Sequence, residues 1–217
     1  MDVKLVYMTN DPVGACRTAA AICTNAKDPE KALRTAMLSG HDSVLEHATF
    51  SFEISGISRS ALAQITRHRI ASYAVMSQRY CDQRDQGCVV PSTIRSNEEA
   101  DQLMNYTIAA LGRVYDRLLE LGIPKEDARY ALPEGTTTHM LLTMNARELG
   151  HFFALRSCNK AQWEVREVSD RMLDICKKVA PELFLTTGPG CIRGHCPEKR
   201  PCGHPRNEEL MFEYEPE

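Results

Sequence analysis

The spacing of apolar residues changes along the chain between a period of two and a period of three to four, which predicts both strands and helices. Strands are predicted where apolar residues alternate or form short stretches, at 3–8, 49–54 and 136–144. Helices are predicted at 13–24, 29–39, 97–121, 145–156 and 162–179. We therefore expect an α/β (α+β mixed) fold, with a central, mostly antiparallel sheet flanked by long helices.

Several helix starts are marked by residues that can cap the first turn. Asp28 before Pro29 marks one start, and either Ser58 or Ser60 marks another. The helix after these serines should carry one stripe, formed by Leu62, Ile65 and Arg69. The longest predicted helix has an apolar stripe that we expect to be a packing face, formed by Leu103, Tyr106 or Thr107, Leu111, Val114, Leu118 and Leu121.

The composition changes abruptly at Gly188, where the helical pattern gives way to Gly, Pro, Cys and basic residues. We therefore expect a folded domain at 1–187 and an appended tail at 188–217. The end of the tail is acidic and is predicted to be disordered. Its acidic residues are Glu208, Glu209, Glu213, Glu215 and Glu217.

The overall composition is that of a globular protein without a membrane or nucleic-acid partner. Hydrophobic residues make up 43% of the chain, and the formal net charge is -3. No apolar run is long enough to cross a bilayer, and the first residues do not resemble a signal peptide. Nine Cys without such a signal are typical of reduced thiols, so we expect a cytoplasmic location.

The cationic residues are unusual, because eighteen of the 26 are Arg, the side chain that binds phosphate bidentately. The densest basic segment runs from Arg67 to Arg79 without an acid. Arg67-His68-Arg69 alone could be a solvated helix end, but the Ser and Arg residues that follow favour a phosphate site. If the stretch after His68 is extended, Ser77 and Arg79 lie on the same side.

This basic segment resembles the signature of flavin-dependent thymidylate synthases. The fixed positions of the signature are all present, as Arg67, His68, Arg69, Ser72, Ser77 and Arg79. The segments 41–47 and 145–164 are also similar to blocks of this family, and similar stretches run from about residue 1 to about residue 185. Ala74-Val75 stands where many members carry Asn-Glu, so these two positions can offer a ligand only backbone contacts.

The resemblance implies reductive methylation of deoxyuridylate (dUMP) to thymidylate (dTMP). In this reaction 5,10-methylenetetrahydrofolate supplies the one-carbon unit and NADPH reduces bound FAD. The implied FAD contacts are Ser43, Arg67, His68, Arg69, Asn145, Arg147 and His151. The implied dUMP contacts are Gln64, Ser77, Gln78, Arg79, Arg129 and Arg156.

The resemblance gives two residues a more particular place. Arg156 is the implied catalytic residue, which faces the uracil ring and favours its ionisation at N3. His41 is implied near the flavin or the folate. The family resemblance also implies a homo-oligomer, a tetramer whose active sites are shared between chains.

Other chemistry in the folded part is less well supported. No His or acid stands at a spacing from Ser77 that would orient a base toward its hydroxyl, so phosphate binding is the better interpretation. Cys81 and Cys88 could be thiolate nucleophiles, but Cys is most often buried, so we expect inert packing. The segment 41–47 matches no zinc pattern, and Glu46 more simply pairs with a cation.

The tail leaves two alternatives open, a zinc site or free thiols. Its potential ligands, with His195 interleaved, are Cys191, Cys196, Cys202 and His204. A nucleic-acid-binding module that uses this tail and the basic segment is the alternative function for the whole chain. The net acidity, the single Trp and the absence of interleaved aromatic residues argue against it.

Overall fold

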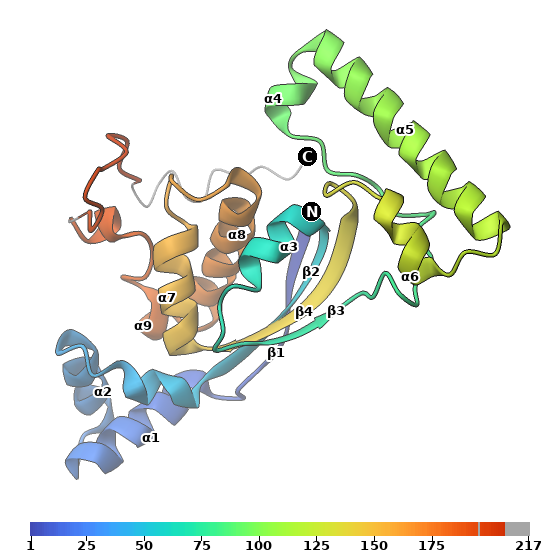
Figure 1. Cartoon of the computed structure of the whole chain (residues 1–217). Coiled ribbons are helices and arrows are strands. Elements are labelled where there is room, and N and C mark those ends of the chain that lie inside the picture. Colours follow the sequence, from blue (N-terminus) through green and yellow to red (C-terminus); the bar gives the residue numbers. More distant parts are fainter. Residues whose placement is uncertain (195, 207–217) are drawn as a thin grey trace. The chain divides into compact units, whose positions relative to one another are not determined.

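The computed structural model describes residues 1–194 and 196–206, and it contains a four-stranded antiparallel sheet (Figure 1). The strands follow the order β1-β2-β4-β3 across the sheet. Their bounds are β1 Asp2–Met8, β2 Thr49–Ser58, β3 Ser72–Val75 and β4 Thr137–Asn145. The expected mixed fold with an antiparallel sheet is confirmed. β3 is a strand that the apolar pattern did not predict.

The chain divides into two compact units, each assembled from separate segments. The first unit comprises 1–2, 54–67 and 74–140, and the second comprises 3–53, 68–73 and the chain from 141 onward. Helices of the first unit are α3 Arg59–Ile65, α4 Ser92–Arg95, α5 Glu98–Glu120, α6 Lys125–Ala128 and η2 Arg129–Ala131. Helices of the second are α1 Pro12–Thr24, α2 Pro29–Leu38, η1 Asp42–His47, α7 Ala146–Arg156, α8 Trp163–Val179, α9 Pro181–Phe184 and η3 Gly190–Arg193. The domain boundary expected at residue 187 stays a prediction.

Over the ranges that the structure describes, the six helices of seven or more residues begin where a side chain satisfies an N–H group of the first turn. Asp28 Oδ1 accepts from Lys31 N at 3.1 Å, and Pro29 follows as the first helical residue, as predicted. Ser58 rather than Ser60 caps α3, because its Oγ accepts from Ala61 N at 2.9 Å.

The core of the second unit is built around aromatic rings from three elements. Phe50 of β2, Phe153 of α7 and Phe184 of α9 are buried and meet edge to face. The ring centroids lie 5.4 Å apart for Phe50 and Phe184 and 6.1 Å apart for Phe153 and Phe184, distances that favour aromatic pairs. This packing fixes α7, the helix that carries three of the candidate site residues, Arg147, His151 and Arg156.

The helix α3 is shorter than expected, so the prediction that it reaches Arg69 was wrong. It ends at Ile65, and Thr66 follows as its C-cap. The Thr66 N–H and the Thr66 hydroxyl both donate to Leu62 O, each at 3.0 Å, and close the last turn. The three residues of the Arg-His-Arg sequence therefore lie beyond the helix.

The apolar stripe of α5 is not a packing face within one chain, contrary to expectation. Leu103 is 66% exposed, Tyr106 70% and Leu121 61%. Tyr115 is the one fully buried side chain among the described residues of α5. The stripe follows the predicted helical spacing, but four of its members are exposed, and only Leu111 and Leu118 are half-buried.

The described part of the tail packs against the second unit. The Arg206 guanidinium is buried and donates to Asp170 Oδ2 of α8 at 2.7 Å and to Ser157 O at 2.8 Å. Asn159 Nδ2 donates to His204 O at 2.6 Å. The acidic end, predicted to be disordered, lies outside the described residues. In the described part of the chain no helix has both the length and the apolarity to span a bilayer.

Candidate functional site

The stretch after the Arg-His-Arg sequence is extended only over β3, and the residues that follow form a turn, so the condition under which Ser77 and Arg79 would share one side of a strand is not met. Cys81 N donates to Ser77 O at 2.9 Å, and Arg79 N donates to Ser77 Oγ at 3.2 Å. A Ser hydroxyl that accepts a backbone N–H two residues later stabilises a tight turn. The alternation of side chains along a strand therefore does not set the relative position of Ser77 and Arg79. The turn holds them together instead.

Arg79 is positioned by an acidic side chain and by an aromatic ring. Its Nε donates to Glu126 Oε2 at 2.7 Å, and its guanidinium lies 5.4 Å from the centre of the Tyr80 ring. About half of the Arg79 side chain is exposed. An anion that reaches Arg79 would have to compete with Glu126.

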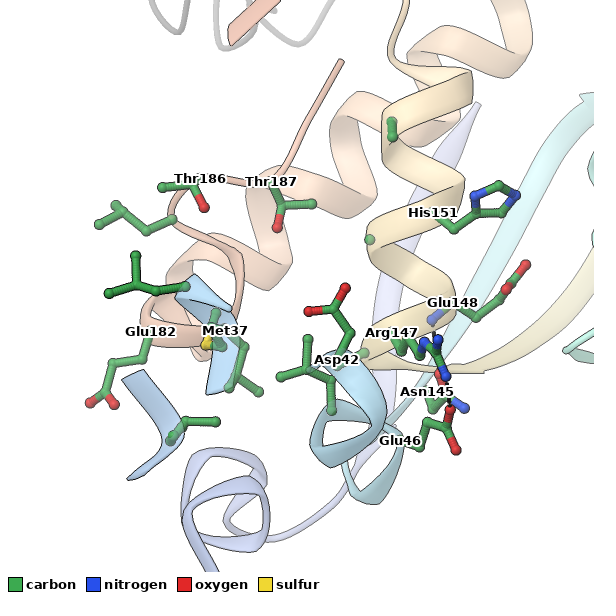
Figure 2. A pocket seen from close by; sticks show the side chains of 18 of the residues that line it. Met37, Asp42, Glu46, Asn145, Arg147, Glu148, His151, Glu182, Thr186 and Thr187 are labelled. Carbon is green, nitrogen blue, oxygen red and sulfur yellow. Dashed lines mark hydrogen bonds and ion pairs between the residues drawn. The ribbon is translucent and has the colours of Figure 1, made fainter. Parts of the chain in front are cut away.

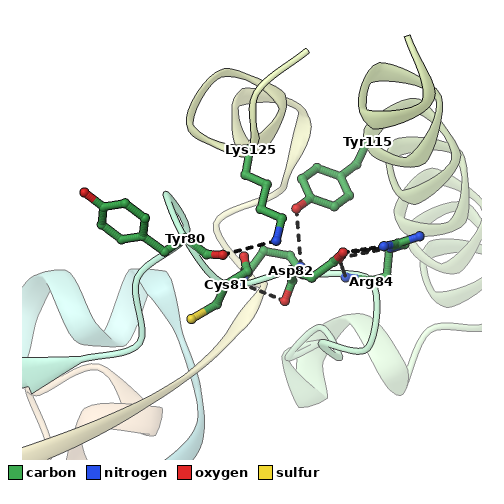
Figure 3. A network of polar contacts seen from close by, with 7 residues as sticks. Tyr80, Cys81, Asp82, Arg84, Tyr115 and Lys125 are labelled. Atoms are coloured by element: carbon green, nitrogen blue, oxygen red, sulfur yellow. Dashed lines mark hydrogen bonds and ion pairs between the residues drawn. The ribbon is translucent and has the colours of Figure 1, made fainter. Parts of the chain in front are cut away.

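A polar network fixes the chain just after this turn (Figure 3). Lys125 Nζ donates to Tyr80 O at 3.1 Å, and Gln83 N donates to the Tyr115 hydroxyl at 3.3 Å. Asp82 pairs with Arg84, which lowers the pKa of the Asp82 carboxyl to about 2. This anchoring to α5 and α6 holds the turn at one end.

The two cysteines beyond the turn differ from each other. Burial raises the pKa of the Cys88 thiol, which agrees with inert packing. Cys81 is exposed, so the expectation that it packs inside the protein was wrong.

A cavity of about 570 Å³ lies in the first unit, and Gln78 and Arg129 line it, two of the predicted dUMP contacts. Arg59 also lines it, a residue that the sequence did not single out. Burial lowers the pKa of Arg59, and the Arg129 charge lowers it further, while Glu134 raises it. Glu134 lines the cavity as well, so the two guanidinium groups exceed its acids by one charge, and this excess favours an anion.

A larger cavity, of about 1120 Å³, lies in the second unit (Figure 2). The predicted FAD contacts Asn145, Arg147 and His151 line it, and all three come from the start of α7. Asn145 Oδ1 accepts from Glu148 N at 2.8 Å and so caps this helix. Arg147 pairs with Glu46, as predicted for a cation near that acid. The cavity is therefore polar along α7.

A buried histidine joins two side chains of α7. His68 is 6% exposed, and its Nδ1 lies 3.2 Å from Glu148 Oε1. Arg156 Nε donates to His68 Nε2 at 3.1 Å, and the Tyr73 hydroxyl donates to His68 O at 2.7 Å. Burial lowers the pKa of His68, and so do Arg156 and His151, while Glu148 raises it.

Among the described residues, one group could hold a metal ion, formed by His68, Glu148 and His151 with ligand atoms within 4.8 Å of one another. Both ring nitrogens of His68 are already hydrogen-bonded, and a cation near Nε2 would be repelled by Arg156. We therefore interpret the group as a hydrogen-bonded network.

The predicted site residues fall into two sets according to the unit that carries them. The first unit carries Gln64, Arg67, Ser77, Gln78, Arg79 and Arg129. The second carries His41, Ser43, His68, Arg69, Asn145, Arg147, His151 and Arg156. The first set holds five of the six predicted dUMP contacts, and the second holds six of the seven predicted FAD contacts. His41, Ser43, Arg67 and Arg69 are exposed and line neither cavity.

The predicted tail ligands are only partly assembled. Cys191 Sγ accepts from Arg206 N and Cys202 Sγ accepts from His204 N, both at 3.4 Å. Within 1–194 and 196–206, neither of these cysteines, nor Cys196 or His204, belongs to a group of three close ligands. His195 lies outside the described residues. A zinc site in the tail stays a prediction.

Comparisons with known proteins agree on one family. The family described as "Thymidylate synthase complementing protein" matches residues 4–182. The chain is 42% identical to the flavin-dependent thymidylate synthase of Geobacter sulfurreducens over 227 residues, which cover 98% of each chain. It is also 42% identical to that of Saccharolobus solfataricus, with 88% of this chain and 78% of the relative covered.

A solved structure is similar over most of its length. It is the flavin-dependent thymidylate synthase of Helicobacter pylori complexed with FAD and dUMP. The TM-score is 0.70 at 30% identity, and the similarity covers 87% of this chain and all of the other. The fold and the sequence therefore point to the same family.

Proposed function

The chain belongs to the flavin-dependent thymidylate synthase family, and from this we propose that it methylates dUMP to dTMP reductively with bound FAD. The observation that carries the proposal is the 42% identity to such an enzyme along 98% of both chains. NADPH is proposed as the reductant, and 5,10-methylenetetrahydrofolate as the one-carbon donor. We place the enzyme in the cytoplasm.

The larger cavity is proposed as the FAD site because it is large and its α7 wall is polar. Its volume of about 1120 Å³ exceeds the range of roughly 300–1,000 Å³ typical of ligand pockets. Arg147 and Arg34 supply positive charge for a pyrophosphate, which must compete with Glu46 for Arg147, and Asn145 and His151 supply polar contacts. The cavity is also lined by five acids, Glu30, Asp42, Glu46, Glu148 and Glu182. When bound, FAD supplies the hydride chemistry, and the protein supplies orientation and electrostatics. We propose Ser43, Arg67, His68 and Arg69 as further contacts and His41 as a residue near the flavin or folate.

The smaller cavity fits the phosphate end of a nucleotide. Arg59 and Arg129 are proposed to bind the phosphate, and the buried Gln78 contributes a polar group to the same wall. Gln64, Ser77 and Arg79 are proposed as further dUMP contacts by resemblance. The two guanidinium groups explain why a nucleotide would be preferred over its nucleoside.

Arg156 is proposed to act on the uracil ring. Its burial lowers the pKa of the guanidinium, but Arg keeps its charge in proteins. A fixed cation in a partly desolvated place stabilises a uracil anion formed by ionisation at N3. This ionisation would make C5 the carbon nucleophile.

A visible spectrum of the purified protein tests the function. FAD is added first, then NADPH without oxygen, and then dUMP with methylenetetrahydrofolate. We expect the flavin to bleach with NADPH and to regain its colour when both substrates are present. A protein that binds no flavin would contradict the proposal.

Arg129→Ala is expected to weaken binding of dUMP much more than binding of deoxyuridine. Loss of one hydrogen-bonded charge costs about 1.5–3 kcal/mol, which corresponds to roughly 10–150-fold in affinity. Calorimetric titration of the two ligands measures the difference. Arg113→Ala, an exposed Arg on α5, is the matched control and should leave both affinities unchanged. Equal losses for both ligands in Arg129→Ala would rule out phosphate binding there.

The exposed stripe of α5 supports a homo-oligomer, and we propose a tetramer with shared active sites. Soluble proteins rarely leave a large apolar stripe in water. Leu103→Glu together with Leu121→Glu is expected to lower the oligomeric state, because a charge inside an apolar interface is costly. Light scattering measures the change. A fully active monomer in the unmodified protein would contradict shared sites.

A further inference from the structure

Glu148 is a nearly buried carboxylate on α7 to which neither the sequence nor the comparisons give a role. Its side chain is 10% exposed. A buried carboxylate is costly unless it is paired. The Glu148 carboxylate hydrogen-bonds His68, which follows α3 and lies eighty positions earlier in the chain. Figure 2 shows Glu148 and His151 projecting from the same side of α7.

The hydrogen bonds of His68 determine where its proton lies. Arg156 Nε can only donate, so His68 Nε2 must accept at their separation of 3.1 Å. A neutral imidazole with an accepting Nε2 carries its proton on Nδ1. That N–H then donates to Glu148 Oε1, 3.2 Å away. The hydrogen bonds therefore form a continuous series from Arg156 through His68 to Glu148, in which each bond has one donor and one acceptor.

This series of hydrogen bonds ends at the planar guanidinium group of Arg156. This group is flat and rigid, so fixing the direction of Nε–H restricts the direction of its remaining N–H groups. His68 is itself fixed, because its ring lies 4.8 Å from the Phe152 ring and its carbonyl accepts from Tyr73. A small misorientation of a catalytic group can cost roughly 100-fold in rate.

We propose that Glu148 is a positioning residue, which holds His68 in the Nδ1–H form and thereby aligns Arg156. The inference rests on the proposed function, in which Arg156 meets the uracil ring. Glu148 also lines the larger cavity proposed for FAD, but the positioning role requires no contact with the flavin or the substrate. It acts through His68 alone.

The surroundings of His68 favour the neutral ring that these hydrogen bonds require. His68 faces Glu148, His151 and Arg156 of α7 and Tyr73 of β3. Burial has the largest effect and lowers the pKa of His68, while Glu148 opposes that shift. A proton on Nε2 would place two donors opposite each other beside a guanidinium.

Two variants of Glu148 separate its acceptor from its charge. Glu148→Gln keeps an oxygen that can accept from Nδ1–H, so kcat is expected to stay within about tenfold of the unmodified enzyme. Glu148→Leu removes the acceptor, so kcat should fall roughly 100-fold. FAD binding, followed by its visible spectrum, should persist in both. Glu167→Leu removes a carboxylate from an ion pair on α8 and is the matched control for stability.

Two further measurements show whether the effect passes through His68 and Arg156. In an Arg156→Lys background, Glu148→Leu should lower the residual rate by less than threefold, because the aligned group is already gone. Nitrogen NMR of ¹⁵N-histidine-labelled protein should show His68 protonated at Nδ1, with His68→Gln used to assign the signal.

Each outcome bears on one claim. An Nε2–H or doubly protonated His68 would overturn the hydrogen-bond chain, whatever the protein catalyses. Unchanged kcat in Glu148→Leu, in an enzyme that makes dTMP, would overturn the positioning role and leave the function intact. Equal losses in the Gln and Leu variants would show that the charge matters rather than the acceptor, and would also overturn it. Absence of dTMP formation in the unmodified protein would instead contradict the proposed function.

Discussion

Replacing Arg156 by Ala is expected to lower the rate of dTMP formation by roughly 10²–10³-fold while the protein stays folded and keeps FAD. A preorganised group that stabilises developing charge is worth about 2.7–4 kcal/mol in known enzymes. Arg156 is the cation that meets this need in the second unit, and its guanidinium is held by His68. Single-turnover assays with reduced enzyme separate this loss from slower flavin reduction.

Two comparisons sharpen the Arg156 prediction. Arg156→Lys keeps the charge but loses the planar donor group, so it should recover only part of the rate. Arg166→Ala on α8 removes an Arg that donates to backbone carbonyls of 159 and 161, and it should leave turnover near that of the unmodified enzyme. Turnover near normal in Arg156→Ala would remove Arg156 from the catalytic role.

Much of the fold could be predicted because local signals and helical periods agree with it. Asp28-Pro29 marks the start of α2, and Asn97 caps the long helix α5 through Ala100 N. The signals fail where tertiary contacts decide. β3 forms in a basic segment without apolar alternation, where it pairs with the distant strand β4.

The apolar stripe of α5 shows a different limit of the sequence. Its spacing predicts that one face of the helix avoids water, and the structure leaves Leu103 and Tyr106 exposed. A periodic stripe does not indicate whether its partner belongs to the same chain or to another copy. The same pattern thus supports a core helix or an interface helix equally well.

The candidate site could be predicted only as far as the family signature extends. Arg59 was missed, although a cation in the first turn of a helix opposes the helix dipole and was a usable signal. Glu148 was missed because its partner His68 is distant in sequence. The hint was its place three residues before His151, on the same face of α7. Contacts between distant segments carry no local pattern.

Arg206→Met is expected to destabilise the protein by about 3–5 kcal/mol at neutral pH, because it leaves Asp170 buried without its partner. Asp170 is 1% exposed, and burial raises the pKa of its carboxyl, while Arg206 opposes that shift. Without Arg206 the pKa of Asp170 in the folded state rises further above its pKa in the unfolded state. The folded state then binds more protons than the unfolded state between these two pKa values, so stability falls as pH rises through that window.

The loss in Arg206→Met should therefore be smaller in mildly acidic buffer than at neutral pH. Urea unfolding at one chain concentration, repeated at several pH values, measures it. Lys160→Met breaks the exposed pair with Glu198 and should change the stability far less than Arg206→Met does. Adding Asp170→Leu to Arg206→Met should restore most of the lost stability, since an apolar pair needs no neutralisation. If Arg206→Met costs no more than Lys160→Met, the tail is not held by this ion pair.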